Sequence, residues 1–250
     1  MVVAIHRANK QPDYCKSVTK YLARELHIGV LYPLFTKNFA LPEDRHYWYL
    51  CNLQDNSEGS EISQLTKPRE FGQFAMPNQC YGVDYQKSVI KKNKKLHPES
   101  NWICEEWTKA IRNNNFNPAL VYLDTTYFGD RYPAIRALKQ TMDLCPKDTL
   151  LIANVMMANP RAGNGQELFN QDSLVENLLM NQHSQKYASW NTSPEDSDVN
   201  VFHSYDYKTS KTTMRSYIFF KGVLPQEETI QKEFTKFKNW CSYSYQQIPK

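Results

Sequence analysis

Two short apolar runs of this chain end on carboxylates, and the segment between them is rich in lysine. Asp84 follows the run 81–83, and Glu105 and Glu106 follow the run 102–104. A buried parallel strand that ends on an acid places that acid at the carboxyl edge of its sheet, where open α/β folds bind ligands. Two such edges in succession suggest a nucleoside pocket, in which one carboxylate binds ribose hydroxyls and the other a base edge.

Strand and helix patterns alternate along the chain from about residue 46, as apolar runs of strand length are separated by segments of helical periodicity. Strands are expected at 47–53, 79–84, 101–104, 117–124 and 148–157, and helices at 59–65, 86–96, 105–114 and 131–143. This alternation predicts an α/β fold, in which right-handed crossovers connect a mostly parallel sheet with helices on both faces.

The two ends of the chain add further elements to this sheet. Their patterns predict an amphipathic helix over 12–27, an irregular cover segment over 28–45, a β-hairpin over 199–222 and a final helix over 227–240. The hairpin contributes one antiparallel strand. No linker divides the chain, so we expect a single domain with an N-terminal helical and cover segment (1–45), a core (46–222) and a C-terminal helix (223–250).

The composition is that of a globular protein with a mild positive charge. Hydrophobic residues make up 41% of the 250 positions, and the formal net charge is +4. This charge permits contact with phosphates without requiring it, because dedicated nucleic-acid binders are usually more basic. The aromatic content of 13% is high. Exposed aromatic rings could stack on bases, although most such side chains serve core packing.

The six cysteines and six histidines indicate neither a metal site nor a catalytic triad, because none are paired at the required spacing. Cys51, Cys80 and Cys104 fall in or beside expected strands, where a free thiol acts as a small buried hydrophobe. The best apolar run, 150–157, is too short to span a bilayer, and no signal-peptide core opens the chain. We therefore expect a cytoplasmic protein with neither a metal nor a membrane partner.

The order of five β–α units followed by a hairpin resembles the class I S-adenosylmethionine-dependent methyltransferases, over roughly residues 46–222. In that family the acid that ends the second strand binds both ribose hydroxyls of the cofactor, and the next residue often packs on the adenine. The resemblance therefore implies a Rossmann-like fold, S-adenosylmethionine as cofactor, and cofactor-binding roles for Asp84 and Tyr85. The residues alone also allow Asp84 to be a helix cap without any ligand.

The end of the third expected strand offers a second match to the cofactor site. In the family an acid there approaches the adenine amino group, which implies this role for Glu106, with Glu105 as the second choice. Trp107 is then a candidate stacking wall. Two glutamates that open a helix also favour its dipole without a ligand, so both interpretations stay open.

The segment Asp124-Thr-Thr-Tyr127 ends the fourth expected strand. It resembles the Asp-Pro-Pro-Tyr motif of enzymes that methylate exocyclic amines of adenine or cytosine, in which the acid accepts hydrogen bonds from the amine and the aromatic ring stacks on the flipped base. The resemblance implies catalytic roles for Asp124 and Tyr127, and DNA or RNA as a partner. Threonine replaces both prolines here, and Asp124 could instead touch the cofactor or cap the next helix.

The loop after the first expected strand departs from the family, which has a glycine-rich turn there. Residues 49–62 contain a single glycine, Gly59. At any other residue a Cβ atom prevents the close backbone approach that the methionine part of the cofactor needs. A longer loop could still bind the cofactor through Cys51 and Asn52. The leading hypothesis is a methyltransferase with a nucleic-acid acceptor. The alternatives are a non-catalytic methyltransferase-like interaction protein and a dinucleotide enzyme, which the missing G-x-G-x-x-G disfavours.

Overall fold

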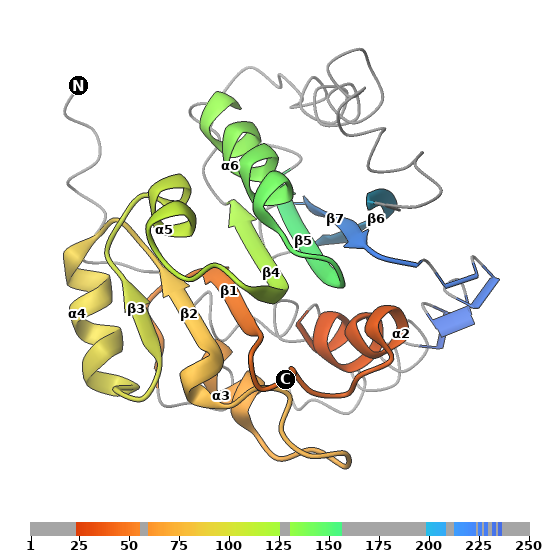
Figure 1. The fold of residues 1–250 in the computed structure, drawn as a ribbon, viewed down its shortest axis with the longest axis horizontal. Coiled ribbons are helices and arrows are strands. Elements are labelled where there is room, and N and C mark those ends of the chain that lie inside the picture. The colour runs from red at the N-terminus through yellow and green to blue at the C-terminus, as the bar shows by residue number, and fades with distance from the viewer. Residues whose placement is uncertain are drawn as a thin grey trace.

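The computed structural model describes residues 24–55, 60–125, 131–156, 199–208 and 213–236, apart from positions 224, 227, 230, 231 and 234. Within these ranges one seven-stranded sheet has the order β3-β2-β1-β4-β5-β7-β6 (Figure 1). The strands are β1 (His46–Leu50), β2 (Cys80–Val83), β3 (Asn101–Ile103), β4 (Pro118–Thr125), β5 (Thr149–Met156), β6 (Val199–Lys208) and β7 (Thr213–Lys221).

Helices cover both faces of this sheet. They are the π-helical turn η2 (His27–Leu31), α2 (Tyr32–Thr36), α3 (Glu61–Thr66), the 3₁₀ turn η3 (Pro77–Gln79), α4 (Lys87–Leu96), α5 (Trp107–Asn113) and α6 (Arg131–Leu144). Side chains of η2, α2, α3 and α4 pack on one face of the sheet, and those of α5 and α6 pack on the other. This two-sided cover is what continuous apolar strands require.

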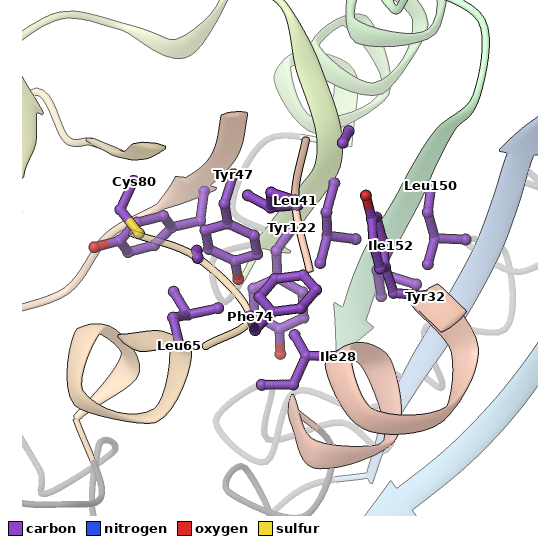
Figure 2. Close-up of a cluster of buried hydrophobic side chains, with 14 of the residues drawn as sticks. Ile28, Tyr32, Leu41, Tyr47, Leu65, Phe74, Cys80, Tyr122, Leu150 and Ile152 are labelled. Atoms are coloured by element: carbon purple, nitrogen blue, oxygen red, sulfur yellow. The ribbon is translucent and has the colours of Figure 1, made fainter. Parts of the chain in front are cut away.

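Alternation along the central strand β1 divides the core into these two layers. Tyr47 and Tyr49 belong to the layer under η2, α2 and α3, whereas Trp48 points into the layer under α5 and α6. Figure 2 shows the first layer, where Ile28 and Tyr32 lie over Tyr122 and Ile152 of the sheet. The ring of Tyr32 meets the ring of Phe74 edge-on, with 5.0 Å between centroids. Large aromatic side chains therefore hold the N-terminal helical residues on the sheet.

The strand directions confirm the mostly parallel sheet. β1 pairs in parallel with β2 and β4, β2 with β3, and β4 with β5. β7 is antiparallel to both of its neighbours, β5 and β6, so the predicted hairpin and its single reversed strand are also confirmed. No helix within the described ranges is long and apolar enough to cross a membrane.

Two boundaries predicted from the sequence were wrong. Residues 28–36, expected to be irregular, are helical: the π-helical turn η2 continues directly into α2, and this irregular stretch of helix tolerates Pro33. The first strand ends at Leu50 and not at residue 53. The predicted helix over 12–27 is described only from residue 24, and that over 227–240 only at six helical positions between 228 and 236.

Gly82 in β2 is required by close packing, which gives a first testable prediction. It pairs with Trp102 in the register, and a Cβ at position 82 would lie 2.5 Å from Cζ3 of Trp102 and 3.1 Å from Cβ of Cys51. We expect Gly82→Ala to lower the free energy of unfolding by about 1–3 kcal/mol, because the core has no room for a methyl group. Urea unfolding followed by circular dichroism measures this.

Gly29→Ala is the matched control for that substitution. A Cβ at position 29 meets its nearest neighbour, Nη1 of Arg69, at an ordinary contact distance of 3.6 Å. Because alanine is favoured over glycine within a helix, this change should leave the stability unchanged or raise it by up to about 1 kcal/mol. Equal losses in both variants would contradict the packing argument.

Candidate functional site

The parallel register brings the ends of neighbouring strands to one level at the carboxyl edge of the sheet. Val83 of β2 lies opposite Leu50 of β1 and Ile103 of β3. The pairing continues for one more residue, because the amide of Cys51 donates to the carbonyl of Val83 at 3.0 Å and that of Asp84 to Ile103 at 3.1 Å. The edge predicted from the two apolar runs is therefore present, with Asp84 in its middle.

Asp84 holds a half-buried carboxylate at this edge. Its Oδ1 accepts a hydrogen bond from the amide of Gln86 at 2.7 Å, and no donor of the described residues reaches Oδ2. Burial raises the pKa of Asp84 above its ordinary value, and the Gln86 amide offsets this only in part. The side chain that could cap α4 belongs to Gln86, which makes no capping hydrogen bond. Asp84 therefore has one carboxylate oxygen without a donor among the described residues, in a place that disfavours its charge.

Tyr85 follows this carboxylate and is 72% exposed, which is unusual for a large side chain. Its carbonyl is contacted by the thiol of Cys104, at 3.8 Å, from the end of β3. Asp84 and Tyr85 thus present a hydrogen-bond acceptor and an aromatic ring on adjacent residues at the edge of the sheet.

Asn93 of α4 holds the loop that follows β1. Its Nδ2 donates to the carbonyl of Asn52 at 2.9 Å and contacts the sulfur of Cys51 at 3.7 Å. Its Oδ1 accepts from the amide of Gln54 at 2.8 Å. Cys51 is buried, and burial raises the pKa of its thiol well above the ordinary value. The side chain of Cys51 is therefore part of the packing under α4, while Asn52 is half-buried.

Gln54 fills the space between this loop and α3. It is 1% exposed, and its Oε1 accepts from the amides of Glu61 at 2.9 Å and Ile62 at 3.3 Å. The next amide, that of Ser63, donates to Oγ of the N-cap residue Ser60 at 3.2 Å. Side chains of the loop therefore satisfy the first amides of α3, which a glycine-rich turn would leave open to a ligand.

Sequence reasoning missed both Gln54 and Asn93 as residues that shape this edge. Asn93 carried a readable signal, because it lies on the apolar face of its helix together with Val89 and Ile90 and is fully buried. A polar side chain on such a face must find hydrogen-bond partners in the core. Gln54 carried none, since its partners are backbone amides that no spacing in the sequence identifies.

Glu106 is the N-cap of α5, a place that agrees with the interpretation in which the two glutamates open a helix without a ligand. Its two carboxylate oxygens accept from the amide of Thr108 at 3.4 Å and from the Thr108 hydroxyl at 2.5 Å. Glu105 accepts from the side-chain amide of Asn113 at 3.3 Å. A contact between Glu106 and an adenine stays a prediction, and the capping bonds would compete with it.

The role predicted for Trp107 was wrong. Its side chain is 4% exposed and lies in the core layer between the sheet and α6, edge-on to Trp48. Its indole N–H donates to the hydroxyl of Thr141 at 2.7 Å. A ring held in this way by α6 offers no face on which a ligand could stack, so Trp107 serves packing.

Asp124 lies half-buried near the end of β4, at the predicted carboxyl edge, and Asn154 of β5 lies opposite it in the register. Asn154 is fully buried, and its Nδ2 donates to the hydroxyl of Tyr122 at 2.5 Å. Tyr127, the other half of the predicted catalytic pair, lies outside the described residues. Among the residues that are described, no group of three or more His, Cys, Asp and Glu could hold a metal ion.

No protein-family model and no curated protein sequence matches this chain. Solved structures of similar arrangement include an rRNA methylase from Streptococcus thermophilus (8% identity, 77% of this chain and 95% of that chain, TM-score 0.46). A second is the N-methyltransferase NodS from Bradyrhizobium japonicum (8% identity, 81% of this chain and 97% of that chain, TM-score 0.44). A third is a TehB-like SAM-dependent methyltransferase from Corynebacterium glutamicum (12% identity, 81% of this chain and 96% of that chain, TM-score 0.44).

The sheet itself decides the fold. Its order β3-β2-β1-β4-β5-β7-β6, with β7 reversed between β5 and β6, is that of the class I methyltransferases. The chain has a methyltransferase-like fold. In this fold Asp84 directly follows the second strand, and the loop held by Gln54 and Asn93 follows the first.

The closure of the first loop by Gln54 gives a prediction on stability. Gln54→Ala leaves the buried amides of Glu61 and Ile62 without their acceptor, which should lower the free energy of unfolding by about 1–3 kcal/mol. The control is Gln73→Ala, because Gln73 is exposed and donates only to the carbonyl of Thr66. It should change stability by less than about 0.5 kcal/mol in the same denaturant titration. Similar values for both variants would contradict the closed loop.

The burial of Asp84 predicts a pH-dependent gain from Asp84→Asn. The raised pKa means that the folded state disfavours the charged carboxylate, so wild type loses stability as the pH rises through that pKa. The asparagine variant should therefore unfold at a higher temperature at pH 7, and the difference should vanish below the ordinary carboxyl pKa of about 4. Asp143→Asn, at an exposed position of α6, controls for the loss of one charge. A variant that is less stable at pH 7 would mean that the carboxylate is a structural cap.

Proposed function

We propose that this chain is an S-adenosylmethionine-dependent methyltransferase that acts on nucleic acid in a reducing, cytoplasmic compartment. One observation carries the proposal: a half-buried carboxylate with a free oxygen, Asp84, stands beside an exposed tyrosine at the end of β2. The methyltransferase-like sheet supplies the frame for it.

The adenosine half of the cofactor fits the residues at the end of β2. A carboxylate can accept two hydrogen bonds from a cis-diol at once, and Oδ2 of Asp84 has no donor among the described residues. Partial burial strengthens such bonds, because less water competes for the oxygen. The exposed ring of Tyr85 offers a face on which an adenine can stack.

The methionine half has a different environment from that of the family. Gln54 and Ser60 already satisfy the first amides of α3, so that part of the ligand would be bound by side chains. Asn52 is the half-buried candidate among the predicted residues, whereas Cys51 is buried beneath Asn93.

Catalysis on this chain would consist mainly of positioning. S-adenosylmethionine, when bound, supplies an electrophilic methyl group. The carboxylate of Asp124 would accept hydrogen bonds from an exocyclic amine and so direct the nitrogen lone pair towards that methyl. Tyr127 would stack on the flipped base.

A second function is supported by the closed first loop. Gln54 and Asn93 together hold the segment that the family keeps open for the cofactor, and Glu106 is engaged by Thr108. A non-catalytic methyltransferase-like protein that binds a nucleic acid or another partner would have no need of an open loop, since a fold does not determine its function.

Two alanine substitutions separate binding from turnover. Asp84→Ala removes charged hydrogen bonds to the ribose and should weaken binding of S-adenosylhomocysteine by roughly 10- to 100-fold in calorimetry. Asp124→Ala should lower methyl transfer to RNA or DNA by roughly 100-fold while cofactor affinity stays within about twofold. Asp143→Ala, at an exposed position of α6, is the control and should leave both unchanged.

The outcomes of this experiment distinguish the two functions. If wild type releases no heat with S-adenosylhomocysteine at about 1 mM and its melting temperature does not rise, the enzyme proposal fails and the non-catalytic function is favoured. If Asp84→Ala and Asp124→Ala weaken cofactor binding equally, the proposed division between the two acids is wrong.

A further inference from the structure

The outer face of α4 carries a stripe of lysines with no acidic neighbour on the helix. Lys87, Lys91, Lys94 and Lys95 are all exposed, and their spacing places them within one third of the helix circumference. We call these four residues the lysine stripe. The opposite face, with Val89, Ile90 and Asn93, is buried against the sheet. The helix therefore cannot turn its lysines away from solvent.

Within the described part of the chain, no residue of the stripe is in an ion pair. The ion pairs that are present involve other cations, namely Arg24, Lys67, Arg69 and Lys236. The stripe thus holds four of the five lysines on the ten residues of α4, whereas the whole chain has a net charge of only +4. The net charge of the chain is thus mild, whereas the outer face of α4 is strongly basic.

This arrangement costs the helix stability. Lys87 and Lys91, and Lys91 and Lys95, are like-charged pairs four residues apart, each of which destabilises a helix by about 0.2–0.5 kcal/mol. Lys87 also stands in the first turn, where the helix dipole disfavours a cation and no acid compensates. A bound polyanion would remove both penalties at once.

We propose that the lysine stripe binds the phosphate backbone of a nucleic acid. α4 packs on β3, the edge strand of the sheet, and lies at the side of the sheet (Figure 1), where no described element covers its lysines. The stripe begins three residues after Asp84, close to the edge where the proposed acceptor would enter. The inference specifies the acceptor of the proposed function, but backbone binding does not depend on methyl transfer.

The chemistry of α4 favours a nucleic acid over a membrane surface. A helix that binds membranes presents apolar side chains beside its basic ones, and those insert among the lipids. On α4 the apolar side chains of Val89 and Ile90 are committed to the core. The exposed face offers only lysines and Ser88, which suits a ligand that presents rows of phosphates.

The length of the stripe sets the expected salt dependence. The eight helical steps from Lys87 to Lys95 span about 12 Å. One strand of duplex presents roughly three to four phosphates over that length, and each neutralised phosphate adds about 0.7–0.9 to the slope of log affinity against log salt. The stripe should therefore contribute a slope of roughly 2–3.

The test compares two variants of equal charge. The stripe variant changes Lys87, Lys91, Lys94 and Lys95 to glutamine, and the control variant changes Lys37, Lys147, Lys232 and Lys236 to glutamine. All eight positions are exposed, and each variant has a net charge of 0, because four positive charges are removed from +4. Glutamine keeps nearly the helix propensity of lysine. Circular dichroism and thermal melting establish that both variants are folded.

Binding is measured by fluorescence anisotropy with labelled single-stranded RNA and duplex DNA of roughly 20 nucleotides per strand, longer than a typical binding site. Titrations run from about 50 to 200 mM salt. The stripe variant should bind roughly 10- to 100-fold more weakly at low salt, with a slope smaller by about 2–3 than that of wild type. The control variant should keep a slope within about 1 of wild type.

Three results would overturn the proposal: equal losses of nucleic-acid affinity in both variants, an unchanged salt slope in the stripe variant, or stripe-dependent binding to anionic lipid vesicles or polyglutamate without binding to nucleic acid.

Calorimetry of the stripe variant with S-adenosylhomocysteine separates this inference from the enzyme proposal. The lysines lie outside the proposed cofactor site, so its cofactor affinity should equal that of wild type. If the chain binds nucleic acid through the stripe but binds no cofactor, the enzyme proposal is refuted and the proposal for the lysine stripe stands.

Discussion

The pairing of β1 with both β2 and β4 is the constraint on which the rest of the structure depends. Because these strands are parallel and in register, every loop that follows them emerges at the same edge of the sheet. The pairing is fixed by burial on both faces: Tyr49 and Trp48 point to opposite sides of β1 and are both fully buried. A slip of one residue would exchange these two rings between layers of different shape.

A buried polar contact links this strand to α3. The hydroxyl of Tyr47 donates to Glu61 at 2.5 Å, and Arg24 lies 3.8 Å from the same carboxylate. Burial and the nearby Glu61 raise the pKa of Tyr47 well above its ordinary value, so its proton stays on the hydroxyl. Gln54 accepts from the first amides of α3, and Tyr47 of β1 donates to the side chain of Glu61, so two contacts hold the start of this helix. The described part of the first loop, residues 51–55, is thus tied to the core through the side chain of Gln54.

The sequence predicted the strands and helices of the core well, because their apolar runs follow the period of one state over their full length. It predicted positions better than roles. The apolar run before Asp84 placed this residue correctly at the carboxyl edge of the sheet. The stacking role predicted for Trp107 was wrong, although the sequence held a signal against it: Trp107, Ala110 and Ile111 follow the i, i+3, i+4 spacing of a buried helix face. The role of Gln54 could not be foreseen, since hydrogen bonds from a side chain to distant amides leave no periodic trace.

The unit formed by β2 and α4 joins the features that matter most for function. Its strand ends on Asp84, the inner face of its helix holds the first loop through Asn93, and the outer face carries the lysine stripe. The burial of Val89 and Ile90 fixes the rotation of α4, so these three surfaces cannot be reoriented independently. A displacement of α4 would therefore reach the first loop through Asn93, whose bonds to Asn52 and Gln54 would break together, and through His97 at the end of the helix, which bonds to the carbonyl of Asp55. The same packing of α4 thus positions Asp84, loop residues 52–54 and the lysine stripe relative to one another.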